Sequence, residues 1–298
     1  MTRPTRETRA GRVYLDLQNM ARRNRRPTDE LLALYALEGF LDRLSRSSDA
    51  DRFVLKGGTL LAAYEVRRPT RDVDLHALTT ANEPDRVLSR IRDIAREPVD
   101  DGLVYDVDGA VAETIRDQDQ YNGVRVSMTC QLASAQIVFH VDVSVGDPIS
   151  PAAGSLQLPR LLGGQIILLC YPLPMVLAEK IVTAIERRLT NTRWRDFADI
   201  YLLSRHQAID GSELQDSLQV VADHRQASLI PLATALEGMP ELSQTRWRAW
   251  VRKQKLDGRL PAELGSVLSA VCNFADPAIT GDSKSSIWSP AALAWREE

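Results

Sequence analysis

Two aspartates alternate with apolar residues in the segment Asp72-Val73-Asp74-Leu75. In a β-strand, residues i and i+2 point to the same face, so Asp72 and Asp74 would lie side by side while Val73 and Leu75 point into the core. Two carboxylates held this close repel each other, and a hard divalent cation such as Mg²⁺ removes the repulsion. The spacing therefore predicts a metal site, although an isolated Asp-x-Asp pair is more often a solvated strand edge.

A glycine-rich turn precedes this pair. Phe53–Leu55 reads as a short buried strand, and Leu60–Val66 reads as the start of a helix. The turn between them consists of Lys56, Gly57, Gly58 and Thr59. Exposed backbone N–H groups and the positive end of a helix suit a phosphate group. A Gly-Gly pair alone is usually only a turn, but a turn followed by paired aspartates is the arrangement expected for nucleotidyl transfer.

A third carboxylate interrupts an apolar segment at 137–145, IVFHVDVSV, which is typical of a central strand. An unpaired carboxylate buried there would be costly, so Asp142 is predicted to face a metal ion or a base. Two-metal nucleotidyl transfer needs such a ligand for the ion that activates the attacking hydroxyl. The alternative is a polar position open to water. His140 shares the face of Asp142, and Asp147, in a predicted turn, is a weaker rival.

Two further positions lie on predicted helices later in the chain. From the sequence alone, Lys180 fits a solvated lysine paired with Glu179 or Glu186. Asp196 and Asp199 are three residues apart, so they share one helix face. Acidic residues near a helix start are also favourable simply because of the helix dipole.

The motifs KGGTLL and TRDVDL together resemble the signature of the DNA polymerase β-type nucleotidyltransferase superfamily. Within it, the chain is similar to the AbiEii family of nucleotidyltransferase toxins, which includes the MenT toxins of type IV toxin–antitoxin systems. The Glu-Lys-Ile motif at Lys180 and the segment 191–201 resemble two further motifs of that family. The resemblance covers nearly the whole chain and is strongest at 56–74, 137–145 and 174–201.

The resemblance implies transfer of a nucleoside monophosphate from an NTP to an acceptor hydroxyl, with release of pyrophosphate. Implied metal ligands for Mg²⁺ are Asp72, Asp74 and Asp142, the last helping to activate the nucleophile. Implied nucleotide-binding residues are Lys56, Gly57, Gly58, Thr59, Lys180 and Arg193. Asp196 would position Lys180 or the base.

The implied acceptor is RNA, and the first candidate is the 3′ end of tRNA. Blocking that end would stop translation. The implied partner is a cognate antitoxin, and phosphorylation of Thr59 would repel an NTP. Two alternatives stay open: an antibiotic-modifying type of small-molecule nucleotidyltransferase, and a nucleotide-binding module without turnover. The sequence does not discriminate among NTPs or RNA acceptors.

Composition limits the class of protein. The chain has 298 residues, of which 44% are hydrophobic and 26% charged, as in ordinary globular proteins. Its net charge of −3 argues against a sequence-blind nucleic-acid binder, but not against an enzyme with a local basic cleft. Three dispersed cysteines predict reduced thiols, and no apolar run is long enough to span a bilayer, so we expect a cytoplasmic protein without a membrane partner.

The expected fold class is α+β, with a polymerase-β-like core of a small mixed sheet flanked by helices, followed by a mostly α-helical domain. We expect a basic N-terminal arm at 1–27, a nucleotidyltransferase core at 28–160, and a helical domain at 161–298 that contributes Lys180 and Asp196 to the site. The arm is either a frayed solvated segment or an RNA or partner contact. A loop at 148–159 marks the domain boundary.

Three local expectations remain. The helix that follows Pro27 is predicted to be capped by Thr28 and to carry Arg43 away from its buried stripe. Residues 110–115 fit a strand or a helical turn. Near the C-terminus, five basic residues accompany Trp247 and Trp250. This pattern fits RNA binding by phosphate contacts and stacking, and it fits core tryptophans with solvated bases at least as well. The five are Arg246, Arg248, Arg252, Lys253 and Lys255.

Overall fold

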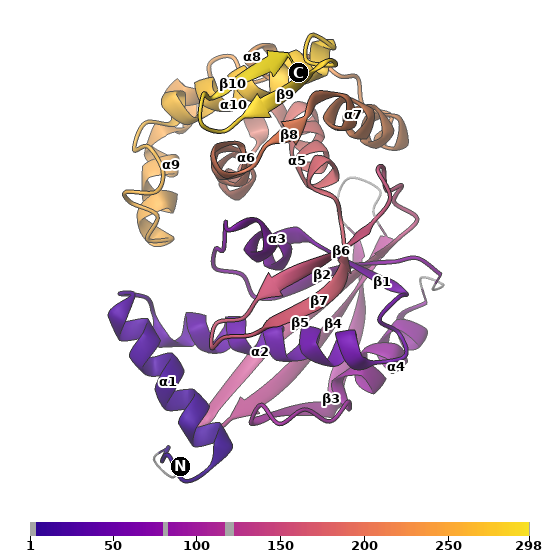
Figure 1. Cartoon of the computed structure of the whole chain (residues 1–298), viewed down its shortest axis with the longest axis vertical. Coiled ribbons are helices and arrows are strands. Elements are labelled where there is room, and N and C mark those ends of the chain that lie inside the picture. Colours follow the sequence, from indigo (N-terminus) through magenta and orange to yellow (C-terminus); the bar gives the residue numbers. More distant parts are fainter. Residues whose placement is uncertain (1–3, 80–82, 117–121, 298) are drawn as a thin grey trace. The chain divides into compact units, whose positions relative to one another are not determined.

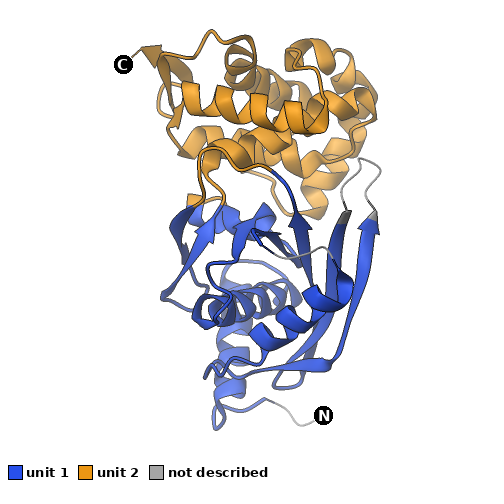
Figure 2. Ribbon diagram, turned by 90° about the vertical axis from the view of Figure 1, so that its right-hand side faces the viewer, with its two compact units in different colours: residues 1–63, 67–147, 154–170 blue, residues 64–66, 148–153, 171–298 orange. Residues whose placement is uncertain are grey.

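The computed structural model describes residues 4–79, 83–116 and 122–297 (Figure 1). The chain forms two compact units (Figure 2). The first unit comprises residues 1–63, 67–147 and 154–170, and the second comprises residues 64–66, 148–153 and 171–298. Each unit is described separately below. No helix in the described part of the chain is both long enough and apolar enough to cross a membrane.

A seven-stranded mixed sheet forms the centre of the first unit, in the order β3-β4-β5-β2-β1-β7-β6 (Figure 1). Its strands are β1 (Phe53–Lys56), β2 (Asp72–Ala77), β3 (Leu103–Arg116), β4 (Asn122–Leu132), β5 (Ala135–Val145), β6 (Gly154–Pro159) and β7 (Gln165–Cys170). The pairs β2–β5 and β1–β7 are parallel and the others antiparallel. This confirms the expected mixed sheet.

Burial alternates along β5, as expected for a strand with one face in the core. Phe139, Val141 and Val143 are buried, whereas Val138 on the opposite face is 57% exposed. The apolar segment is therefore a central strand, but one of its faces is not covered by core residues. His140 and Asp142 lie on that second face and are half-buried.

Helices pack against the sheet of the first unit. They are α1 (Arg9–Arg23), α2 (Thr28–Arg46), α3 (Gly57–Leu60) and α4 (Pro84–Ala95), and a 3₁₀ turn, η1 (Leu61–Tyr64), follows α3. α2 contacts β5 and β7, and α4 contacts β3 and β4. The predicted Thr28 cap is wrong: Pro27 occupies the cap position, no side chain caps the helix, and Thr28 is already helical.

Most of the N-terminal segment forms the helix α1, from Arg9 to Arg23. Val13, Leu17 and Ala21 recur every four residues and are buried, so they form one apolar stripe. α1 packs against α2. The frayed-arm alternative is therefore wrong for residues 9–23.

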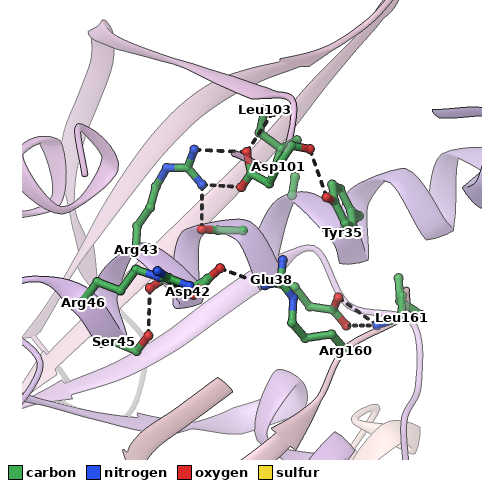
Figure 3. Close-up of polar contacts among 12 residues, drawn as sticks. Tyr35, Glu38, Asp42, Arg43, Ser45, Arg46, Asp101, Leu103, Arg160 and Leu161 are labelled. Carbon is green, nitrogen blue, oxygen red and sulfur yellow. Dashed lines mark hydrogen bonds and ion pairs between the residues drawn. The ribbon is translucent and has the colours of Figure 1, made fainter. Parts of the chain in front are cut away.

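α2 carries buried charges as well as its apolar stripe (Figure 3). Arg43, predicted to lie off the buried face, is buried and its Nη1 donates to Oδ2 of Asp101 at 2.5 Å. Asp42 accepts from Nη1 of Arg160 at 2.8 Å, and Glu38 accepts from the backbone N–H of Leu161 at 3.0 Å. α2 is surrounded by protein, so charges on its polar face must be paired. The contacts of Asp42 and Glu38 fasten α2 to the β6–β7 connection, and the Arg43–Asp101 pair joins it to the segment before β3.

Two other sequence expectations need correction. The predicted loop at 148–159 contains β6, which pairs with β7 as an antiparallel hairpin. β6 is an edge strand and only Leu158 in it is buried, so its hydrophobic pattern is weak. The undecided segment 110–115 is the second half of β3, which carries an irregularity in register between Asp106 and Val111. A bulge interrupts the period-2 pattern from which a strand is predicted.

The second unit is mostly helical, as expected. Its helices are α5 (Leu173–Arg187), α6 (Trp194–His206), α7 (Gly211–Arg225), α8 (Leu232–Ala235), α9 (Met239–Lys253) and α10 (Leu264–Thr280), with the 3₁₀ turn η2 (Arg188–Thr190) after α5. A small sheet of β8 (Ile209–Asp210), β9 (Ser286–Ser289) and β10 (Ala294–Glu297) accompanies them. Trp288 is buried and its Nε1 donates to the carbonyl of Ser204 at 2.6 Å, which ties this sheet to α6.

Candidate active site

The three predicted carboxylates lie on one face of two neighbouring strands. β2 and β5 are parallel, and their register places Asp74 opposite Asp142 and Asp72 opposite His140. All three aspartates are half-buried, whereas Val73 between the first two is fully buried. The alternation in β2 and the strand prediction for β5 were sufficient to choose these residues. Their adjacency depends on the parallel pairing.

This position belongs to a row of charged residues that crosses five strands. Lys56 on β1 lies opposite Asp74, and Arg125 on β4 lies opposite Asp142. Glu113 on β3 lies opposite Arg125 in turn. We call these five residues the charged row. Opposite charges alternate along it except at Asp74 and Asp142, where two carboxylates are neighbours and a cation would be favourable.

Arg125 holds Asp142 in a bidentate pair. Its Nε donates to Oδ1 at 2.8 Å and its Nη2 donates to Oδ2 at 2.7 Å. These hydrogen bonds, with the negative charges of Asp142, Asp72 and Glu113, raise the pKa of Arg125 above its ordinary value even though burial lowers it. The sequence analysis missed this partner. Alternation along β4 could show the face of Arg125, but only the register shows what it meets.

The pair with Arg125 changes the set of groups able to hold a metal ion. Among the residues that the structure describes, no three His, Cys, Asp or Glu side chains are arranged to hold one ion. Asp72 and Asp74 present two carboxylates on one strand face. Mg²⁺ is usually bound by one or two carboxylates together with substrate phosphates, so this pair fits it.

The glycine turn lies directly against Asp74. Gly57 has φ +69°, and a Cβ atom there would lie 2.0 Å from Oδ2 of Asp74, so only glycine permits this approach. The N–H of Gly58 points to the same oxygen at 3.4 Å. Residues 57–60 form one helical turn immediately after β1, whereas the sequence predicted a tight turn before the helix. A Cβ on Gly58 would meet the guanidinium of Arg68 at 3.0 Å, so Arg68 is a cation beside the turn that the sequence analysis did not identify.

Thr59 and Lys56 are engaged inside the first unit. Thr59 is 7% exposed, and its hydroxyl donates to the backbone carbonyl of Asp72 at 3.0 Å. Nζ of Lys56 donates to Oδ2 of Asp147 at 2.9 Å. Both residues therefore hold the turn against its neighbouring strands.

Asp147 is the centre of a separate polar cluster. The hydroxyl of Ser144 donates to its Oδ2 at 2.8 Å, and Nδ1 of His76 lies 3.5 Å from the same oxygen. Burial raises the pKa of Asp147, but the hydrogen bond from His76 and the charge of Lys56 outweigh burial and lower it below its ordinary value. The weaker rival for the third carboxylate thus anchors Lys56 and stays ionised.

Lys180 and Asp196 come together in the second unit. Nζ of Lys180 donates to Oδ1 of Asp196 at 3.0 Å and to Oδ2 of Asp199 at 2.8 Å. Nε of Arg193 lies 2.8 Å from Oδ2 of Asp196. We call these four residues the lysine cluster. Glu186, one partner considered for Lys180, contacts Arg225 at 3.3 Å.

The aspartates of the lysine cluster are deeply buried. Lys180 is 11% exposed, and Asp196 and Asp199 are 4% and 0% exposed. Burial raises the pKa of Asp196, but the positive charges of Lys180, Arg193 and Arg195 overcome it and lower the pKa to about 2. Asp196 is therefore ionised at neutral pH. Asp199 also contacts Lys180 directly.

Comparison with known protein families identifies the family of the chain. The family model described as nucleotidyl transferase AbiEii toxin, type IV TA system, matches residues 39–269. The chain belongs to this family. It is a nucleotidyltransferase of α+β fold, and the AbiEii match spans the glycine turn, the charged row and the lysine cluster. No functionally curated protein matches the sequence significantly.

Solved structures give a weaker likeness. JHP933 from Helicobacter pylori is 14% identical with a TM-score of 0.49, covering 84% of this chain and 92% of that protein. CdnC from E. coli MS115-1, solved with ATP, is 14% identical with a TM-score of 0.25, covering 80% of this chain and 65% of that protein.

Proposed function

We propose that this AbiEii-family enzyme transfers a nucleoside monophosphate from an NTP to a hydroxyl of an RNA acceptor, with the 3′ end of tRNA as the first candidate. The observation that carries the proposal is the Asp72–Asp74 pair on β2, with the Gly57–Gly58 turn directly against Asp74. Modification of that end would block aminoacylation and hence translation. The reaction would take place in the cytoplasm, where tRNA is used.

In this proposal, Asp72 and Asp74 hold Mg²⁺ together with the phosphates of the NTP. When bound, the ion neutralises charge that develops on the reacting phosphate and the leaving pyrophosphate. The backbone of Gly57 and Gly58 and the guanidinium of Arg68 provide donors next to that position. Lys56 and Thr59 contribute by holding the turn, because Asp147 and the carbonyl of Asp72 already engage them.

Asp142 is the proposed group that activates the attacking hydroxyl. The bidentate pair with Arg125 orients the carboxylate. A hydroxyl that hydrogen-bonds to Asp142 is held for attack on the α-phosphorus. Arg125 is therefore a positioning residue in this scheme.

Lys180 is the proposed ligand of the triphosphate, and Arg193 is a second proposed phosphate contact. The structure supports this assignment through the stiffness of the lysine cluster, since two buried aspartates fix the ammonium. A preorganised cation stabilises developing charge without reorganising during the reaction. Asp196 would act through Lys180 and Arg193.

The type IV toxin–antitoxin family implies a cognate antitoxin. Phosphorylation of Thr59 remains our hypothesis for inactivation. The hydroxyl is nearly buried and bonded to β2, so a kinase would have to displace the turn to reach it. Intact-mass analysis after co-expression with the antitoxin tests this, and a mass without added phosphate would count against it.

The proposed reaction is tested by incubating the pure protein with total tRNA, Mg²⁺ and each α-³²P-labelled NTP in turn, beside Asp72→Asn. Label on tRNA that is lost in the variant is the expected result and names the nucleotide. Label on a small molecule would favour the antibiotic-modifying alternative. No label with any NTP or acceptor would favour a nucleotide-binding module.

A further inference from the structure

The most basic stretch of the second unit lies at the end of α9. Residues 245–259 contain six lysines and arginines and one acidic residue, in a chain whose net charge is −3. Within the described part of the chain, Arg246, Arg252 and Lys253 have no ion-pair partner, and all three are exposed. Arg248 differs, because it pairs with Glu263. The unpaired cations of α9 are therefore available to an anionic ligand.

The two tryptophans of α9 have different environments. Trp247 is fully buried, and its Nε1 donates to the carbonyl of Pro261 at 3.0 Å. Trp250 is partly exposed and stacks on Trp247, with ring centroids 5.4 Å apart and an interplanar angle of 28°. Trp247 is thus a core residue, and it supports Trp250 from behind as an aromatic surface.

Three residues of α9 form one stripe. Arg246, Trp250 and Lys253 have the spacing i, i+4, i+7, so they follow one another along one face of the helix. Arg252 lies about 100° further round the helix and belongs to another face. We call the three aligned residues the α9 stripe. It places a ring between cations at the spacing of one helical turn.

We infer that the α9 stripe binds the acceptor RNA, with its cations on phosphates and Trp250 stacked on a base. This inference rests on the proposed RNA acceptor. RNA is recognised in this way because unstacked bases lie on aromatic rings while basic side chains follow the backbone. An acidic protein surface would use the cations but would not require a supported aromatic ring between them.

The test measures binding of fluorescently labelled total tRNA to the full-length chain by anisotropy, without NTP and at several salt concentrations. Arg246→Gln/Lys253→Gln is compared with Lys284→Gln/Arg296→Gln, a control with the same charge change on two exposed positions of the second unit that lie outside α9. We expect the α9 variant to bind about tenfold more weakly, with a salt slope reduced by roughly two. The control should bind like the unmodified chain.

A second pair of variants tests stacking. Trp250→Ala should weaken binding by at least about fivefold, and Trp250→Phe should retain most of it, because a stacked base contributes through the ring. Thermal unfolding of both variants shows whether the second unit remains folded. In the labelling assay, the KM for tRNA should rise in the α9 variants while kcat is unchanged.

The outcomes separate this inference from the proposed function. If tRNA is labelled and the α9 variants bind it like the unmodified chain, the inference is overturned and the proposed function stands. An equal loss in the Lys284→Gln/Arg296→Gln control also overturns it, since net charge would then explain the effect. Binding through α9 without labelling supports the inference and overturns the proposed function. Binding of an acidic polypeptide such as polyglutamate in place of tRNA overturns the RNA assignment.

Discussion

The charged row and the lysine cluster differ in their local balance of positive and negative charge. In the first unit, the half-buried Asp72, Asp74 and Asp142 lie on one face of the sheet, and Arg125 donates to both oxygens of Asp142. In the second unit, one lysine is held by two aspartates that are almost completely buried. The charged row has a local excess of negative charge, whereas the lysine cluster carries its own cations.

This difference has a physical consequence for each region. Carboxylates with a local excess of charge gain from an external cation, so a site for Mg²⁺ is favourable there. A buried ion cluster is balanced internally, and removing one partner leaves an uncompensated buried charge. Substitutions in the charged row should therefore affect activity more than stability. Substitutions in the lysine cluster should affect both.

The largest expected effect is on catalysis at Asp72, which lies beside the charged row on β2. We expect Asp72→Asn to lower nucleotidyl transfer by about 10³-fold, because one of the two carboxylates proposed to bind the metal ion loses its charge. Its free energy of unfolding should change by less than about 0.5 kcal/mol, since repulsion with Asp74 is relieved. Urea unfolding beside the labelling assay measures both. A large loss of stability would show that Asp72 is mainly structural.

The next effect tests the lysine cluster. Lys180→Met leaves Asp196 and Asp199 without their shared cation, so we expect the free energy of unfolding to fall by about 3–5 kcal/mol. We also expect this variant to lose nucleotidyl transfer activity. Lys180→Arg is the matched control, because it keeps the charge but changes the geometry. A stable but inactive Lys180→Met would mean that the cluster contributes to catalysis without holding the fold.

The third prediction concerns the loss of stability at acidic pH, which depends on Asp196 in the lysine cluster. The pKa of Asp196 is lowered to about 2 in the folded chain, and an unfolded aspartate has a pKa near 3.9. A group with a lowered folded pKa stabilises the fold above its unfolded pKa, and this contribution disappears as pH falls toward 2. We expect on the order of 2 kcal/mol to be lost between about pH 4 and pH 2. Asp196→Asn should remove this part of the pH dependence, and an unchanged acid transition would contradict the assignment.

The smallest expected effect tests whether Asp142 can reach the metal ion. Arg125→Gln frees both oxygens of Asp142, which then could join Asp72 and Asp74 as a ligand. In Arg125→Gln, we expect the Mg²⁺ concentration for half-maximal activity to fall by up to about tenfold. The reason is that the freed carboxylate of Asp142 would add a ligand and strengthen cation binding. Titration of activity with Mg²⁺ measures this. An unchanged value would show that Asp142 does not reach the ion.

The fold and the site were predicted to different degrees. β2 was predictable because polar and apolar residues alternate along Asp72–Leu75. α5 was predictable because its apolar residues recur at helical spacing. β6 was missed because an edge strand has only one buried side chain to reveal it. Arg43 was misplaced because pattern reasoning assigns charged residues to the surface, whereas α2 is covered on several sides and pairs Arg43 with Asp101.

The sequence by itself determined the residue types and the local faces: Asp72 beside Asp74, Asp196 beside Asp199, and a glycine turn ahead of β2. Only the tertiary structure decided their partners, because strand order and register join residues that are distant in the chain. Arg125 meets Asp142 across the β4–β5 pair, Lys180 meets Asp199 between two helices, and Trp250 rather than Trp247 is left partly exposed. Local periodicity specifies which way a side chain points, but packing specifies what it touches.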